Sequence, residues 1–158
     1  ISFDINLRPA LWESTEALRQ AVLEFLPKAD IIKISDEELF FVTGKENIED
    51  ALEELFTGNV RLVIFTKGAD GAEAHTKTDK AVSKAEKVEA IDTTGAGDAF
   101  IGSFLYQLYE DGITVNDLDK ISMEQMKRYL DFSNTYCGKS VLKQGVIASY
   151  PDMNEMRS

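Results

Sequence analysis

The sequence predicts an α/β fold with a mostly parallel sheet. Short apolar runs such as "DIIKIS" and "RLVIFTKG" alternate along the chain with longer segments of helical periodicity. The chain has 158 residues, of which 44% are hydrophobic and 28% charged, and this is enough for one globular domain with a substantial core. No linker or repeat interrupts residues 1–158, so we expect a single structural unit.

The first part of the chain predicts three strands separated by helices. "ISFDIN" is a short strand that ends near a carboxylate, and the next apolar periodicity has Ser14 or Thr15 as its cap and Pro27 as its stop. The expected elements, in order, are a strand at 1–6, a helix at 14–26, a strand at 30–35, a helix at 35–44 closed by Gly44, a helix at 47–58 capped by Asn47, and a strand at 61–68.

The second part predicts a hairpin followed by two long helices. "GAEAHT" and "KAVSKAE" are expected to pair across "KTDK". The helices are expected over residues 98–112 and 122–142, and a loop or short tail over 144–156. His75, the only histidine, is expected on the hairpin surface. Trp12 and Cys137 are expected to serve packing.

Charge and composition exclude several classes of function. The net charge of −11 disfavours nucleic-acid binding, and no apolar run is long enough to cross a membrane. The single cysteine permits no internal disulfide, which fits a reducing, cytoplasmic location. Because the chain opens directly in a strand and without Met, we expect a piece of a longer protein.

The stretch "IDTTGAGDAF", residues 91–100, is the strongest candidate for chemistry. Gly95, Ala96 and Gly97 precede a helix whose first N–H groups lack internal partners and can bind an anion such as phosphate. Asp98 would then be a base that takes a proton from an attacking hydroxyl. The motif alone equally fits a tight helix start with Asp98 favoured by the helix dipole. The P-loop pattern is absent, and so is the third glycine of the dinucleotide-binding pattern.

Five stretches resemble, in order, segments of the ribokinase-like (PfkB) carbohydrate kinases. "DTTGAGDAFIGSFL" resembles the C-terminal signature of that family, and "FDINLRPALW" is similar to its fructokinase-like members. The other stretches are "KISDEELFFVTG", "FTKGADGA" and "FSNTYCGKSVLKQGVIASYP". The resemblance implies a three-layer α/β/α ribokinase-like fold. Residues 1–158 would be its C-terminal, nucleotide-binding and catalytic half, without the sugar-binding and lid half.

The resemblance implies a role for each matching residue of the signature. Asp98 matches the catalytic base, and Gly95, Ala96 and Gly97 match the anion hole. The nucleotide-binding set implied is Thr66, Gly68, Gly71, Lys33, Asn134 and Gly97.

The resemblance also implies that two metal ions bind in addition to ATP. Glu38 matches a residue linked to Mg²⁺ through water, although Ser35 replaces the asparagine of the family motif. A monovalent cation, K⁺, would be held near Asp92, Thr94, Val141, Gly145 and Ser149.

Asp4, Asn6 and Arg8 alternate, so a strand would direct all three to one side. In the fructokinase-like context we favour contact with substrate or phosphate over the alternative, a strand-end cap with an exposed ion pair.

The implied function is ATP-dependent phosphoryl transfer to a sugar hydroxyl, with fructose giving fructose 6-phosphate. The alternatives are a non-catalytic nucleotide-binding fragment, or a kinase for 2-keto-3-deoxygluconate, ribose or a nucleoside. The expected partners are ATP and the sugar, with homodimerisation through the lid region and no nucleic acid or membrane.

Overall fold

The computed structural model describes residues 1–157 and shows a five-stranded mixed sheet whose strands lie in chain order. The first three strands are parallel, and the last two form an antiparallel hairpin. The strands are β1 (Ser2–Asp4), β2 (Ile31–Ser35), β3 (Leu62–Thr66), β4 (Ala72–His75) and β5 (Lys80–Ser83). The expected hairpin is confirmed, and it makes two of the four strand pairings antiparallel.

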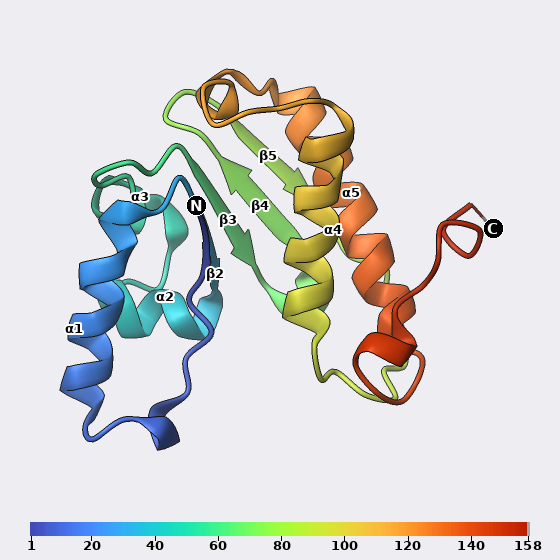
Figure 1. Cartoon of the computed structure of the whole chain (residues 1–158), viewed down its shortest axis with the longest axis horizontal. Helices are drawn as coiled ribbons and strands as arrows, with labels where there is room; N and C mark the ends of the chain where they lie inside the picture. Colours follow the sequence, from blue (N-terminus) through green and yellow to red (C-terminus); the bar gives the residue numbers. More distant parts are fainter. Residues whose placement is uncertain (158) are drawn as a thin grey trace.

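Helices cover both faces of the sheet and complete the expected three layers (Figure 1). One layer contains α1 (Thr15–Phe25), α2 (Asp36–Thr43) and α3 (Ile48–Leu55), and the other contains α4 (Ala96–Glu110) and α5 (Met123–Ser140). Single 3₁₀ turns are η1 (Pro9–Leu11), η2 (Leu26–Lys28), η3 (Gly68–Asp70), η4 (Leu118–Lys120) and η5 (Ile147–Ser149). In the described chain, no helix has the length and apolar composition that crossing a bilayer requires.

Side-chain caps explain where several helices begin. Ser14 accepts a hydrogen bond from the Ala17 amide at the start of α1, and Ser122 forms a reciprocal capping box with Gln125 at the start of α5. Asn47 precedes α3 as expected, but its side chain makes no capping hydrogen bond.

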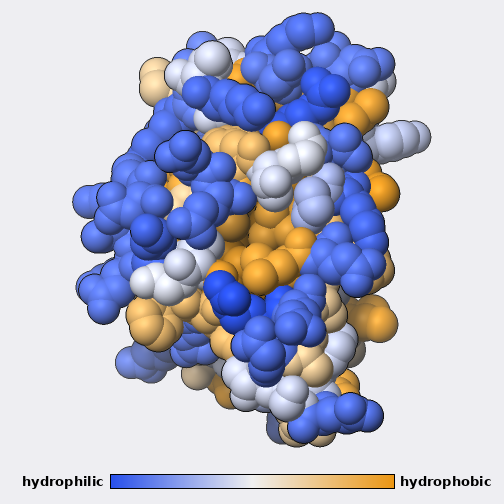
Figure 2. All heavy atoms as spheres, turned by 90° about the vertical axis from the view of Figure 1, so that its left-hand side faces the viewer, coloured by the Kyte–Doolittle hydropathy of each residue, from blue (hydrophilic) through white to orange (hydrophobic). Residues whose placement is uncertain are grey.

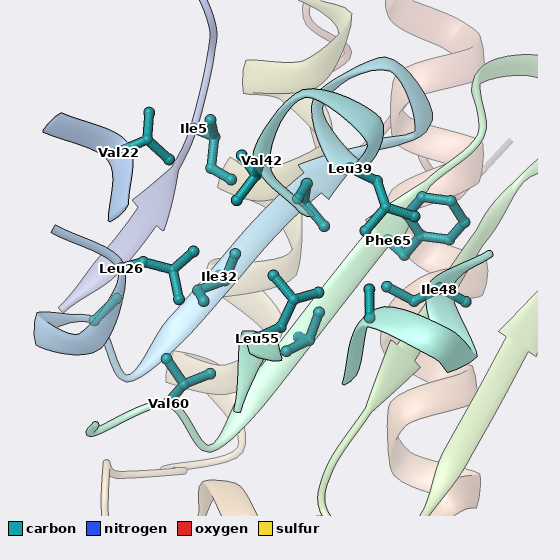
Figure 3. Close-up of a cluster of buried hydrophobic side chains, with 14 of the residues drawn as sticks. Ile5, Val22, Leu26, Ile32, Leu39, Val42, Ile48, Leu55, Val60 and Phe65 are labelled. Carbon is teal, nitrogen blue, oxygen red and sulfur yellow. The ribbon is translucent and has the colours of Figure 1, made fainter. Parts of the chain in front are cut away.

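Alternation along β2 and β3 divides their side chains between two cores. Ile32 and Phe65 belong to the core beneath α1–α3, shown in Figure 3, whereas Ile31 and Ile64 belong to the core beneath α4 and α5. In the second core the rings of Phe104 and Tyr129 pack edge to face with centroids 5.6 Å apart.

Apolar surface is also visible outside the two cores. Figure 2 shows apolar residues at the bottom of a hollow, ringed by hydrophilic ones, on the side of the molecule where α1–α3 lie. A pocket of about 210 Å³ opens among these helices, lined by residues that include Leu23, Leu26, Val42 and Leu55. Among the described residues, β1 is an edge strand of the sheet and pairs only with β2.

Charged side chains cluster around Glu73 on β4, and His75 in this cluster is buried, contrary to the expected surface position. His75 is only 2% exposed, because β4 is an interior strand, and its ring lies 3.1 Å from Glu73. Glu73 also pairs with Lys67 at 2.6 Å and with Lys80 at 2.9 Å. Although burial opposes ionisation, the hydrogen bonds from these two ammonium groups lower the pKa of Glu73 to about 2.

We expect Glu73→Gln to destabilise the fold at neutral pH by about 1–2 kcal/mol, because Lys67 and Lys80 lose a charged acceptor. Since the folded pKa of Glu73 lies below its unfolded value, its contribution is present above that value and is lost as pH falls from about 4.5 towards 2. Urea unfolding should therefore show that Glu73→Gln loses less stability than the parent protein as the pH falls through this range. Glu49→Gln, which removes the other carboxylate on Lys80, is the control and should change stability little. Equal stabilities of parent and Glu73→Gln at pH 7 would contradict this account.

Candidate functional site

Strand register and alternation place one acid and one base side by side beneath α4. Asp4 and Lys33 are register partners on β1 and β2, and Lys33 shares the α4 face of the sheet with Ile31. The Lys33 Nζ lies 3.1 Å from Asp4 Oδ1, and Lys33 is 7% exposed. The sheet therefore holds a buried ammonium group at the carboxyl end of its parallel strands.

The start of α4 lies directly against this ammonium group. Gly95 is the N-cap residue in a left-handed conformation with φ of 75°, and Ala96, Gly97 and Asp98 form the first turn. A Cβ on Gly97 would lie 3.2 Å from Lys33 Nζ, so the missing side chain allows Lys33 to approach the helix. The helix N-terminus and Lys33 both bring positive charge to this spot, in a chain whose net charge is −11.

The free N–H groups at this turn differ from the expected set at one position. The Ala96 N–H donates to the Thr93 carbonyl at 3.1 Å, because a tight turn closes just before the helix. Among the described residues, the N–H groups of Gly95, Gly97 and Asp98 have no hydrogen-bond acceptor. Donors for an anion are therefore available from Gly95, Gly97 and Asp98, and not from Ala96.

Asp4 is held in an unusual electrostatic environment. Burial raises the pKa of Asp4, the Lys33 ammonium opposes this, and the negative charges of Glu38 and Asp98 add to the rise. Asp4 Oδ1 is buried and accepts no hydrogen bond of good geometry, despite the ion pair. Lys33 is therefore the main group that stabilises the charged form of Asp4.

The predicted cation-binding residues lie in two segments that the fold brings together. The Asp92 carboxylate accepts the N–H groups of Thr94 at 2.9 Å and Gly145 at 3.1 Å. Hydrogen bonding by the Thr94 side chain, and then by these two N–H groups, lowers the pKa of Asp92. The Val141 carbonyl accepts the N–H groups of Ile91 and Asp92. These contacts join residues 91–95 to the loop that follows α5.

Ser149 belongs to the same loop and is buried. Its hydroxyl donates to the Val146 carbonyl at 2.7 Å. Among residues 1–157, no three His, Cys, Asp or Glu side chains gather as a metal site, so a cation here would rest on mixed carboxylate, carbonyl and hydroxyl oxygens. Such hard oxygen donors suit a hard cation such as potassium.

Two residues around the turn were missed at the sequence level, Tyr150 and Val146, while Cys137 packs there as expected. The Tyr150 hydroxyl donates to the Gly95 carbonyl at 3.2 Å, Val146 packs against Gly95, and the Cys137 thiol lies 3.4 Å from the Ala96 carbonyl. Burial raises the pKa of Cys137, which keeps the thiol protonated. Only the position of Val146 and Tyr150 beside the predicted cation residues could have indicated their role.

Glu38 has a structural task in addition to its predicted one. Its carboxylate accepts the Ser35 N–H at 2.8 Å in the capping box of α2, and the Leu7 N–H at 3.3 Å. Glu38 thereby ties the segment after β1 to the start of α2. Ser35, which stands in place of the family asparagine, caps the helix, because its hydroxyl accepts the Glu38 N–H.

The predicted nucleotide-binding residues fall into two groups. Lys33 and Gly97 lie together at the start of α4, and the other residues lie near η3 and β5. Thr66 ends β3, Gly68 begins η3 and Gly71 follows it, and both glycines have positive φ. Gly71 lies so close to β5 that a Cβ would be 2.1 Å from the Ser83 carbonyl oxygen. Asn134 on α5 donates to the Ser83 hydroxyl at 2.8 Å, so Gly71 and Asn134 converge on one residue.

Asn6 and Arg8 do not follow Asp4 on a strand, contrary to the expected alternation. β1 ends at Asp4, and Asn6 is left-handed with φ of 49°. Arg8 is exposed and donates to the neighbouring Leu7 carbonyl at 2.8 Å. The structure thus brings Asp4 to the start of α4 through Lys33, and it shows no such contact for Asn6 or Arg8 among the described residues.

A cleft of about 510 Å³ runs between α4 and α5 from the first turn of α4. Asp98 lines it together with aromatic side chains, among them Tyr106, Phe132, Tyr136 and Tyr150. Asp98 itself is exposed, which makes its carboxylate accessible to a ligand at this end of the helix.

We expect Gly95→Ala to destabilise the fold by about 1–3 kcal/mol, because a side chain here meets both a strained φ and a steric clash. The added Cβ would lie 2.5 Å from a Val146 methyl group. Gly112→Ala is the matched control, since Gly112 has a similar φ of 67° with no atom within 4 Å of the added Cβ. Urea unfolding of the two variants separates the clash from the backbone strain. A loss no larger in Gly95→Ala than in Gly112→Ala would show that the loop does not pack tightly on Gly95.

Comparison with known proteins shows which family this chain belongs to. The model of the pfkB family of carbohydrate kinases matches residues 1–153. Fructokinase-1 of Zea mays is 35% identical over 157 residues, which cover 99% of this chain and 47% of the maize protein. Fructokinase-1 of Oryza sativa subsp. japonica is 34% identical over 96% of this chain and 46% of its own length.

Solved structures agree in fold. A fructokinase from Xylella fastidiosa with bound ATP superposes with a TM-score of 0.90 at 27% identity, covering 99% of this chain and 50% of that protein. A fructokinase double mutant from Vibrio cholerae, solved with fructose, ADP and a potassium ion, gives a TM-score of 0.85 at 31% identity over 99% and 48%. The chain therefore spans about half the length of the relatives it matches.

Proposed function

The chain belongs to the pfkB family of carbohydrate kinases, and we propose that it supplies the nucleotide-binding and catalytic half of a fructokinase. The reaction is transfer of the γ-phosphoryl group of ATP to a hydroxyl of fructose, which gives fructose 6-phosphate and ADP. The observation that carries the proposal is the first turn of α4, where unpaired N–H groups, the buried Lys33 and the exposed Asp98 lie together.

Charge at this turn suits phosphoryl transfer. The N–H groups of Gly97 and Asp98 and the Lys33 ammonium stabilise negative charge that develops on the transferring phosphoryl group. These donors are fixed by α4 and by the Asp4 ion pair, so little reorganisation is needed when the anion arrives.

Asp98 acts as the base. Its side chain is exposed and makes no hydrogen bond or ion pair within the described residues, so its carboxylate is available to a sugar hydroxyl. It takes the proton as the hydroxyl oxygen attacks the γ-phosphorus, and ADP leaves with the electrons of the broken P–O bond.

We assign the nucleotide and cation contacts by matching residues of this chain to the motifs of the family. ATP contacts the turn at Thr66, Gly68 and Gly71, and its adenine lies near Asn134. Asp92, Thr94, Val141, Gly145 and Ser149 would hold a monovalent cation, which supplies positive charge beside the anion site. Glu38 would act towards Mg²⁺ through water, because each carboxylate oxygen keeps a further lone pair. The magnesium ion supplies neutralising charge for the phosphates when it is bound.

Asp98→Asn should lower fructose-dependent turnover by about 10²- to 10⁴-fold with little change in ATP affinity, because it removes the base and retains the shape. A coupled assay of ADP release measures the first quantity and calorimetry the second. Asp50→Asn is the matched control, since Asp50 is also an acid in the first turn of a helix, α3, away from the site. Turnover of Asp98→Asn within a few-fold of the parent would refute the role of Asp98.

A second candidate function is a nucleotide-binding unit without catalysis of its own. It is favoured by the observation that the chain covers only 46–47% of the fructokinases from rice and maize. Binding of ADP by the 158-residue chain, with no ADP release from ATP and fructose, would support this alternative over the first.

A further inference from the structure

The carbonyl of Gly95 receives two hydrogen bonds from different parts of the chain. The Ala99 N–H donates at 2.8 Å and forms the first main-chain bond of α4. The Tyr150 hydroxyl donates at 3.2 Å from the loop after α5, 55 residues away in the chain. A carbonyl oxygen has two lone pairs, so both bonds can form together.

Both ends of the peptide unit between Gly95 and Ala96 are therefore anchored. Its oxygen is held by Ala99 and Tyr150, and its N–H is held by the Thr93 carbonyl. Because a peptide unit is planar, fixing its two ends sets where the chain enters α4. The next N–H groups along the chain, those of Gly97 and Asp98, are the unpaired donors of the anion site.

Tyr150 is the anchor that comes from outside this local turn. Its hydroxyl would lie 3.1 Å from a Cβ on Gly95, so it packs on the glycine as well as bonding its carbonyl. The Tyr150 ring is supported by Tyr136 of α5, with centroids 6.1 Å apart.

We propose that Tyr150 is a positioning residue for the anion site, which aims the Gly97 and Asp98 N–H groups by holding the Gly95 peptide from the opposite segment. The inference rests on the proposed function, because it concerns the site assigned there to the transferring phosphoryl group. Tyr150 acts through Gly95 and contacts no reacting atom. Its hydroxyl is the part that matters, and its ring supplies support.

The test uses Tyr150→Phe, which removes the hydroxyl and keeps the ring. The 158-residue chain is labelled with ¹⁵N-glycine, and inorganic phosphate is titrated while the amide signals of Gly95 and Gly97 are followed. We expect the affinity for phosphate to fall about three- to tenfold in Tyr150→Phe, the effect of one hydrogen bond. Tyr109→Phe is the matched control, because Tyr109 lies on α4 and is 79% exposed, and its affinity should stay within twofold of the parent.

Thermal unfolding separates positioning from simple support of the fold. A positioning role predicts weaker phosphate binding by a variant that is still folded at the titration temperature. An unchanged phosphate affinity in Tyr150→Phe overturns the inference, whether or not the melting temperature falls. An equal loss of affinity in Tyr109→Phe overturns it as well.

Release of ADP from ATP and fructose is measured on the same samples, so that the two proposals fail separately. Absence of ADP release by the parent contradicts catalysis by this chain, while the phosphate titration still decides the role of Tyr150. Absence of any phosphate-dependent shift at Gly97 in the parent overturns the role of Tyr150, because no anion site is then present to be positioned.

Discussion

The arrangement of the site depends on one buried charge, the ammonium group of Lys33. An ammonium group is costly to bury unless a partner compensates it, and Asp4 on the adjacent strand is that partner. The N-terminus of α4 points its own partial positive charge at the same spot. The ammonium group and the helix end therefore both place positive charge where an incoming anion would bind, although the carboxylates of Asp4 and Asp98 lie close by. The sheet register places Asp4 beside this group, and the glycine at position 97 leaves room for it at the start of α4.

The second constraint is the closure of the loop after α5 over the turn before α4. Asp92, Gly95 and Ala96 each contact residues more than forty positions further along the chain. These contacts hold the turn from α5 and the loop after it, while Lys33 contacts it from β2. Asp98 remains exposed at the start of α4.

Elements with local signals could be predicted from the sequence, whereas contacts between distant segments could not. The helix between Ser35 and Gly44 has both its cap and its stop in the sequence, and the runs of β2 and β3 are unmistakably buried strands. The glycine turn and Asp98 were found in the same way, because their chemistry lies in consecutive residues. Tyr150 has no local signal, since its role depends on where the loop after α5 returns.

The errors have physical causes of the same kind. His75 was expected at the surface, but β4 has a strand on each side and its side chains are buried. The alternation of Asp4 with Asn6 and Arg8 predicts one shared side only while the strand continues, and β1 stops at Asp4. Ala96 was grouped with its glycine neighbours, although the turn uses its N–H internally. The burial of His75 depends on a tertiary neighbour, whereas Asn6 and Ala96 depend on local backbone geometry, and spacing alone reveals neither.

The chain-order arrangement of the sheet has a consequence for folding. Each strand pairs with the one immediately before it, so every pairing closes a modest loop and the sheet can grow by successive addition. The contacts that enclose the site are different, because Asp92 meets Gly145 across 53 residues and Gly95 meets Tyr150 across 55. These contacts join the start of α4 to the loop that follows α5, across more residues than separate any register partners in the sheet. Closing the binding turn therefore costs more chain entropy than forming any one strand pair.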